Sequence, residues 1–223
     1  MLIAIDTSTE WIGLALYDGV QILSEQSWRS QHFHTTELAP AVYSMLERAR
    51  VSTKDVTGIG VAIGPGSFTG MRIGIAFAKG LALALNVPIV GIPTLDILAC
   101  GQPVMRRPMI CLLEVGRGRF AWARYEGVKG VWVRKTEVAV DEPKDIAKMI
   151  TSPIYVCGEM AAEERHVLGR KWKTAKLAEA SQSVRRPAVL AELASQKLKS
   201  GQVDDIPSLS PIYVHTLSNI PEV

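Results

Sequence analysis

The feature that most constrains this chain is a glycine-rich segment, residues 64–74 (GPGSFTGMRIG). It follows a short apolar run at residues 57–63 and leads into a stretch that stays apolar as far as Leu85. This order predicts a strand, a turn and a helix that begins at a Ser67 or Thr69 cap. The segment is not a Walker A loop, because its glycine spacing differs and no Lys-Ser/Thr pair follows. It also lacks Gly-x-Ser-x-Gly, so it does not indicate a hydrolase nucleophile elbow.

The first hundred residues predict one α/β lobe. Apolar or alternating runs predict strands at residues 2–5, 11–17, 20–25, 57–63 and 88–92. Asp18-Gly19 is a tight-turn pair that closes the second and third strands into a hairpin. Apolar residues at helical spacing predict a helix from Thr35 or Thr36 to about Arg50. Three strands followed by alternating helices and strands imply a mixed sheet with helical crossovers.

The rest of the chain predicts a second group of strands and a returning helix. Residues 101–108 resemble a linker, since they contain two prolines and two arginines. Strands are expected at residues 109–113, 120–125, 131–133 and 154–157, one helix near Pro143, and an amphipathic helix over residues 188–200. We therefore expect an N-terminal lobe (residues 1–102), a smaller C-terminal lobe (103–187), and a helix and tail (188–223) that pack back on the first lobe.

The helix after the glycine-rich turn predicts a partner surface. Between residues 73 and 85 its single charge is Lys79, and a helix that is apolar nearly all round is buried on more than one side. We expect Ile73, Phe77, Leu81 and Ala84 to face the sheet, which leaves another apolar face free. With the helix over residues 36–50, this face forms a predicted partner surface of Leu38, Val42, Tyr43, Leu46, Met71, Gly74, Ile75, Ala78 and Ala82. The alternative is that the chain's own C-terminal helix covers it.

The turn after the first strand is a candidate phosphate loop. It reads Asp6-Thr7-Ser8-Thr9, and backbone N–H groups with small hydroxyls can hold a phosphate, while an aspartate there can handle a metal or water. The alternative is that Asp6 and Ser8 only hydrogen-bond the turn itself. The glycine-rich segment has the same two interpretations, an anion site at a helix N-terminus or tight strand-to-helix packing.

Composition excludes several other classes. A net charge of +3 from 25 basic and 22 acidic residues is too small to indicate nucleic-acid binding by itself. A basic group could touch RNA, although a solvated face is the more frequent explanation: Arg165, Arg170, Lys171, Lys173 and Lys176. His32 and His34 have no third ligand nearby, so no metal site is predicted. The three cysteines form no Cys-x-x-Cys pair and are expected to be reduced, mostly buried thiols.

The chain also predicts a cytoplasmic location. No basic region or cleavage-like site is seen before the first apolar run, so we expect no signal peptide. The most membrane-like stretch, residues 73–92, contains Lys79, Asn86 and Pro88. A buried helix followed by a strand fits this stretch better than a bilayer span.

These motifs together resemble the bacterial TsaB (YeaZ) family. The resemblance rests on residues 5–9 and 64–74, and it continues through Gly-Leu-Ala at 80–82, Val-Pro at 87–88 and Gly-Ile-Pro-Thr-Leu at 91–95. It covers the first hundred residues well and the second lobe loosely. The ending at residues 211–215 resembles the family's Pro-x-Tyr-Leu-Arg tail, with His215 in place of the arginine.

The resemblance implies both a fold and a function. The fold is a two-lobed, actin-like ATPase (ribonuclease H-like) fold with mixed sheets and a degenerate second lobe. Proteins of this family are non-catalytic subunits of the machinery that makes N6-threonylcarbamoyladenosine at position 37 of tRNAs reading ANN codons. They pair through the two helices of the N-terminal lobe with the catalytic paralogue TsaD, and they work with the small ATPase TsaE. We expect this subunit to contact tRNA only indirectly and to bind no cofactor by itself. Two possibilities stay open: a homodimer of the isolated protein, and a nucleotide bound at the interface with the partner.

The sequence differences between this chain and the catalytic paralogue also indicate a non-catalytic subunit. That paralogue carries a His-x-x-x-His metal pair, whereas residues 93–98 here read Pro-Thr-Leu-Asp-Ile-Leu. Gly158-Glu159 is the nearest remnant of a double-glycine adenosine loop, and residues 114–118 read Glu-Val-Gly-Arg-Gly where the family has Asp-Ala-Arg-Arg-Gly. We therefore expect a scaffold subunit with no catalytic residue. The competing hypotheses are a divergent actin-like kinase or carbamoyltransferase that uses Asp6 and Ser8, and a glycoprotease-like peptidase, for which no nucleophile–base pair is evident.

Overall fold

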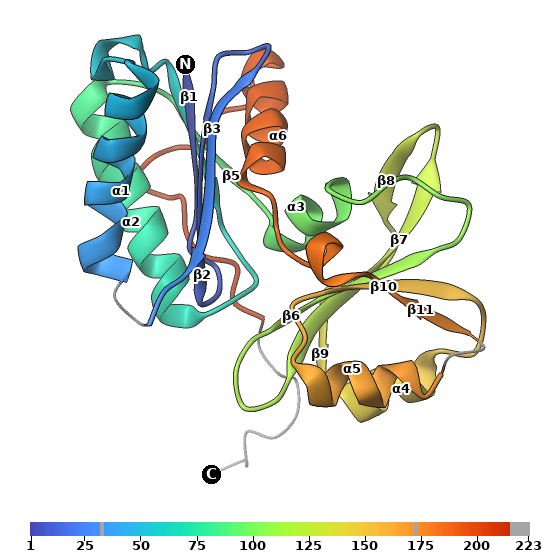
Figure 1. Ribbon diagram of the computed structural model, residues 1–223. Helices are drawn as coiled ribbons and strands as arrows, with labels where there is room; N and C mark the ends of the chain where they lie inside the picture. Colours follow the sequence, from blue (N-terminus) through green and yellow to red (C-terminus); the bar gives the residue numbers. More distant parts are fainter. Residues whose placement is uncertain (32–33, 172–173, 215–223) are drawn as a thin grey trace.

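Two β-sheets, one before and one after residues 101–108, organise the chain into two lobes (Figure 1). The structure is a computed structural model and describes residues 1–31, 34–171 and 174–214. The first sheet has the strand order β3-β2-β1-β4-β5. Its strands are β1 (Leu2–Asp6), β2 (Trp11–Tyr17), β3 (Ile22–Arg29), β4 (Gly58–Ala62) and β5 (Ile89–Ile92). β1, β2 and β3 pair antiparallel, whereas β4 and β5 run parallel to β1, so the predicted mixed sheet is confirmed.

The hairpin between β2 and β3 is confirmed, but β3 starts later than predicted. One carboxylate oxygen of Asp18 accepts hydrogen bonds from the backbone N–H groups of Val20 and Gln21, at 2.7 and 2.6 Å. These bonds keep both residues in the turn. The strand therefore runs over residues 22–29 rather than 20–25.

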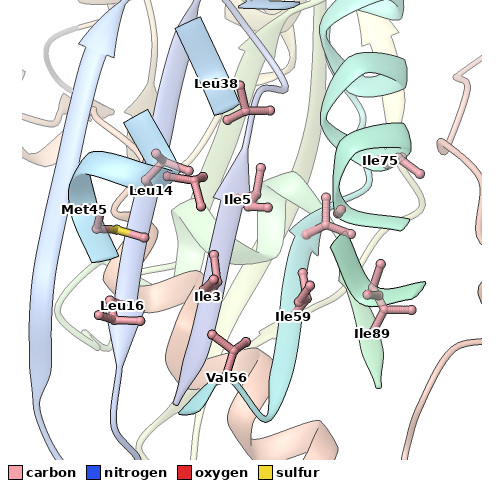
Figure 2. Packing of buried hydrophobic residues seen from close by; sticks show 14 of the residues in the cluster. Ile3, Ile5, Leu14, Leu16, Leu38, Met45, Val56, Ile59, Ile75 and Ile89 are labelled. Atoms are coloured by element: carbon pink, nitrogen blue, oxygen red, sulfur yellow. The ribbon is translucent and has the colours of Figure 1, made fainter. Parts of the chain in front are cut away.

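Three helices cover the two faces of the first sheet (Figure 1). α1 (His34–Ala49) and α2 (Phe68–Leu85) lie on one face, and α6 (Pro187–Lys199) packs against β1, β2, β4 and β5 on the other. The side chains of β1 alternate between these layers. Ile3 and Ile5 belong to the core under α1 and α2 (Figure 2), and Leu2 and Ala4 belong to the core under α6. Both faces of this sheet are therefore buried, which explains its nearly continuous apolar strands.

The second sheet has the order β11-β10-β6-β7-β8, and β9 also pairs with β7. Its strands are β6 (Met109–Glu114), β7 (Phe120–Val128), β8 (Val131–Arg134), β9 (Ala139–Asp141), β10 (Ile154–Gly158) and β11 (Ala175–Leu177). α4 (Pro143–Met149) and α5 (Ala162–Gly169) contribute to the core on one face, and α3 (Thr94–Cys100) to the core on the other. The sequence analysis assigned no element to α3 or β9. Two short 3-10 turns, Thr53–Asp55 and Ala180–Gln182, complete the described elements.

α2 is also the one described helix that is long and apolar enough to cross a membrane. It packs against β1, β4, β5 and α1, and Asn86 ends it in a left-handed conformation just before β5. Such packing is typical of a core helix. The prediction that residues 73–92 form a buried helix followed by a strand is therefore confirmed.

Candidate functional site

The turn after β1 and the glycine-rich segment are bonded to each other. The Thr7 hydroxyl donates to the carbonyl of Gly70 at 2.7 Å, and the Ser67 N–H donates to the carbonyl of Ser8 at 2.6 Å. A Cβ on Gly66 would lie 2.1 Å from that Ser8 oxygen, so a side chain there would force the two loops apart. The Ser67 hydroxyl also accepts from the Gly70 N–H, so the predicted Ser67 cap of α2 is confirmed.

Thr94, the first residue of α3, completes this network. Its hydroxyl lies 2.9 Å from the Ser8 hydroxyl and accepts from the Gly64 N–H at 3.0 Å. The Thr94 N–H in turn donates to the Gly64 carbonyl. Hydroxyl groups that could hold a phosphate are thus already bonded within the protein.

A buried arginine occupies the other side of the turn. The Arg185 Nε donates to Asp6 at 2.7 Å, and its Nη2 donates to the Thr9 hydroxyl at 3.1 Å. Its Nη1 pairs with Glu159, which follows β10 in the second lobe. Arg185 is 4% exposed and Asp6 is 3% exposed, so this is an internal ionic cluster that joins the two lobes.

The cluster holds its cation firmly. Burial alone would lower the pKa of the Arg185 guanidinium, but the carboxylates of Asp6 and Glu159 outweigh it and raise that pKa above its ordinary value. The guanidinium therefore stays charged at neutral pH. One guanidinium is shared by two acidic side chains, one from each lobe.

A cleft of about 680 Å³ lies next to this cluster, between the two lobes. Its first wall includes Thr9, Glu10, Trp11 and the start of α2, and its second wall includes residues 114–116 and 158–161. Burial raises the pKa of the Glu114 carboxyl, and the nearby carboxylates of Glu164, Glu10 and Glu159 raise it further. The cleft lining contains three glutamates, Glu10, Glu114 and Glu159, together with the arginines Arg29 and Arg165.

The predicted partner surface needs correction. Eight of its nine residues are buried in the protein's own core: Leu38, Val42, Leu46, Met71, Gly74, Ile75, Ala78 and Ala82. Tyr43, at 69% exposed, is the remaining one. The prediction that Ala84 faces the sheet is also wrong, because Ala84 is exposed. An apolar residue occurs on nearly every side of α2, so periodicity could not tell the inner face from the outer one.

The outer face of α2 is apolar as well. Leu83 is 65% exposed and Phe68 is 54% exposed. Among the other exposed positions of α2, Ala76, Gly80 and Ala84 are small, whereas Thr69 and Arg72 are polar. α6 lies on the opposite face of the sheet, so the alternative in which the C-terminal helix covers α2 is wrong.

The chain after α6 packs along one flank of α2. The Gly91 N–H donates to Asp204, the Ile212 N–H donates to the Ile63 carbonyl, and the Lys79 ammonium donates to the Pro207 carbonyl. At the start of α2 the Arg72 guanidinium lies 3.8 Å from the centre of the Phe68 ring, and its Nε donates to the Tyr213 hydroxyl. The contacts of this C-terminal segment join residues more than 100 positions apart, so no local sequence pattern predicts them.

Within the described residues, no group of three or more His, Cys, Asp and Glu side chains could hold a metal ion. His34 Nε2 lies 3.1 Å from the Thr9 carbonyl, so it is part of the loop network. Cys111 and Cys157 are buried with their sulfurs 3.5 Å apart, and Cys100 is exposed. Three residues that entered the sequence-based predictions lie outside the described ranges: His32, Lys173 and His215.

The geometry defines the class of protein. Two lobes, each a mixed sheet with helices on both faces, meet at a cleft beside the turn after β1, and this is the actin-like arrangement that the sequence predicts. Among solved structures, YeaZ from Pseudomonas aeruginosa has a TM-score of 0.75 at 24% identity and covers 96% of this chain and 99% of its own. Another P. aeruginosa structure, described as an uncharacterized protein with similarity to peptidase YeaZ, has a TM-score of 0.79 at 24% identity, with the same coverage.

The family follows from the sequence comparisons. The chain belongs to the TsaD family, described as tRNA N6-adenosine threonylcarbamoyltransferase, whose model matches residues 22–205. The Bacillus subtilis tRNA threonylcarbamoyladenosine biosynthesis protein TsaB is 29% identical, covering 96% of this chain and 93% of the relative. The Escherichia coli TsaB is 32% identical over 64% of this chain and 63% of the relative. The predicted resemblance to the TsaB (YeaZ) branch is confirmed.

Proposed function

We propose that this protein is a non-catalytic partner subunit in the formation of N6-threonylcarbamoyladenosine in tRNA. The relatives from B. subtilis and E. coli are named as biosynthesis proteins for this nucleoside, which supports the pathway. The proposed partner is a catalytic TsaD-like paralogue of the same fold. A TsaE-like ATPase joins the pair, tRNA is contacted mainly through the partner, and the protein acts in the cytoplasm.

The observation that carries the pairing proposal is the outer face of α2. A helix that carries only Arg72 and Lys79 as charged residues exposes Phe68 and Leu83, and Tyr43 is exposed on α1, the other helix of the same layer (Figure 1). Exposed apolar groups of this size on one helical layer mark an interaction site more often than a free surface. The small residues Ala76 and Gly80 between the large ones allow a partner helix to approach closely.

The closed turn supports a role without catalysis. Asp6, the one candidate metal or water ligand of the turn, is bonded to Arg185 and to the Ser8 N–H. The Ser8 hydroxyl faces Thr94 and not a histidine, so the turn contains no nucleophile–base pair of the kind that a peptidase needs.

The first experiment is light scattering on a size-exclusion column, with the protein alone and mixed with its own organism's TsaD-like paralogue. We expect a one-to-one complex for the wild type. Leu83→Arg should abolish the complex, because it places a charge on the exposed apolar face of α2. Ala78→Arg is unsuitable, since Ala78 is fully buried and the variant would disrupt the core.

Val131→Arg is the matched control. Val131 is an exposed apolar residue of the second lobe, away from α1 and α2, so this variant should pair normally. In a reconstituted assay with the paralogue, the ATPase, tRNA and threonylcarbamoyl-AMP, formation of the modified nucleoside should be lost with Leu83→Arg and kept with Val131→Arg. Absence of a wild-type complex at micromolar concentrations, or normal pairing of Leu83→Arg, would overturn the proposal.

A further inference from the structure

We propose that Arg185 is an internal clamp that holds the two lobes closed. In this protein a guanidinium lies between the carboxylate at the end of β1 and the carboxylate after β10. This inference concerns the cleft and does not depend on the pairing face of α2.

The contacts of Arg185 come from both lobes. Asp6 and Thr9 belong to the turn of the first lobe, whereas Glu159 belongs to the second. Arg185 itself lies on the segment that leads from the second lobe back to α6, which packs on the first sheet (Figure 1). A single side chain therefore fixes three segments that a rotation of the lobes would separate.

The residues of the turn do not fit a nucleotide phosphate. Asp6 binds a cation supplied by the chain, and the hydroxyls of Thr7 and Ser8 bond to Gly70 and Thr94. The Arg185 guanidinium is already paired with Asp6 and Glu159, so it is not free to bind a phosphate. Lobe closure in this protein is thus set by the fold rather than by a bound nucleotide.

Arg186, the next residue along the chain, provides a matched control. Arg186 also links the segment to the first lobe, through Glu25 of β3, but this pair is more exposed: 58% for the Arg186 side chain and 22% for that of Glu25. Removing a surface ion pair costs little, whereas removing Arg185 leaves Asp6 as a buried carboxylate without its counter-ion. The same substitution at adjacent positions therefore separates the clamp from an ordinary ion pair.

The test compares wild type, Arg185→Ala and Arg186→Ala by amide hydrogen exchange. In Arg185→Ala we expect exchange to accelerate at least tenfold, in peptides from both sides of the joint, residues 6–10 and 157–161. Arg186→Ala should resemble the wild type there. Methylguanidinium chloride, against equal sodium chloride, should restore protection and melting temperature in Arg185→Ala alone, because it can refill the cation position.

Two results would overturn the clamp. One is an Arg185→Ala variant whose exchange at the joint matches that of Arg186→Ala. The other is accelerated exchange on only one side of the joint, which would show a local role. If Arg185→Ala does not fold, Arg185→Lys takes its place, since it keeps the charge but cannot reach Asp6, Thr9 and Glu159 together. The same two results would then decide. A fluorescent ATP analogue should show no saturable binding to the wild-type protein, and saturable binding abolished by Thr9→Val would also contradict the proposal.

Discussion

At the scale of single residues, two glycines of α2 show how closely the helix and the turn after β1 fit. A Cβ built on Gly74 would lie 2.1 Å from the Thr7 hydroxyl oxygen, which is itself bonded to the Gly70 carbonyl. A Cβ built on Gly80 would meet no atom within 4 Å. The two positions lie in one helix, so the difference between them reports contact with the turn and not helix propensity.

The prediction is that Gly74→Ala and Gly80→Ala change stability in opposite directions. Gly74→Ala should lower the free energy of unfolding by about 1–3 kcal/mol, because the turn must shift to accept the methyl group. Gly80→Ala should raise it by about 0.5–1 kcal/mol, because alanine loses less backbone entropy in a helix. Urea unfolding of both variants measures this, and equal effects would contradict the described contact between α2 and the turn.

At the scale of elements, the sequence predicts which strands and helices form the first lobe, but not which face of α2 points outward. β1, the β2–β3 hairpin, β4, β5 and the helices α1 and α2 are evident from periodicity and caps, because those patterns are local. The outward face of α2 could not be predicted, since small and apolar residues surround the helix. α3 was missed because it has only seven residues after Pro93. The bond between Arg185 and Asp6 joins residues 179 positions apart, and no local pattern encodes such a contact.

α6 shows that a helix distant in sequence can complete the first lobe. Leu190, Ala191 and Ala194 are fully buried against the sheet, and a Cβ on Gly60 would lie 2.5 Å from the Ala194 Cβ. The small residues on both sides let the helix lie close to β4. The stability of the first lobe therefore depends on residues from the end of the chain.

Leu190→Ala should lower the free energy of unfolding by about 2–5 kcal/mol, since it leaves a cavity under α6. Leu83→Ala is the matched control, the same substitution at an exposed position of α2, and should change the isolated protein by less than about 0.5 kcal/mol. Thermal or urea unfolding compares them. A Leu190→Ala variant as stable as Leu83→Ala would show that α6 is not part of the first core.

At the scale of the whole molecule, carboxylates from the two lobes approach one another at the cleft. The second lobe brings Glu114 and Glu159 toward Glu10 of the first. Of these three, Glu10 pairs with Arg29 and Glu159 with Arg185, whereas Glu114 has no ion-pair partner among the described residues. The Arg185 cluster thus joins two lobes whose carboxylates oppose one another. This opposition predicts a measurable dependence of stability on pH.

The pKa of Glu114 is raised above its ordinary value of 4.5 by burial and by the neighbouring carboxylates. In the pH window between the ordinary pKa of 4.5 in the unfolded chain and the raised pKa in the folded protein, the folded protein binds more protons than the unfolded chain. The contribution of Glu114 to stability therefore falls as pH rises through this window. Glu114→Gln should therefore be more stable than the wild type at pH 7, by less than about 1 kcal/mol because the side chain is largely solvated. The difference should shrink toward zero below pH 4.5, where the carboxyl is protonated in both states.

Glu137→Gln, at an exposed site outside the cleft lining, controls for the loss of one surface charge. Urea unfolding of the three proteins from pH 4 to pH 8 provides the measurement. A Glu114→Gln variant that follows the wild type at every pH would show that the carboxylates of the two lobes do not interact across the cleft.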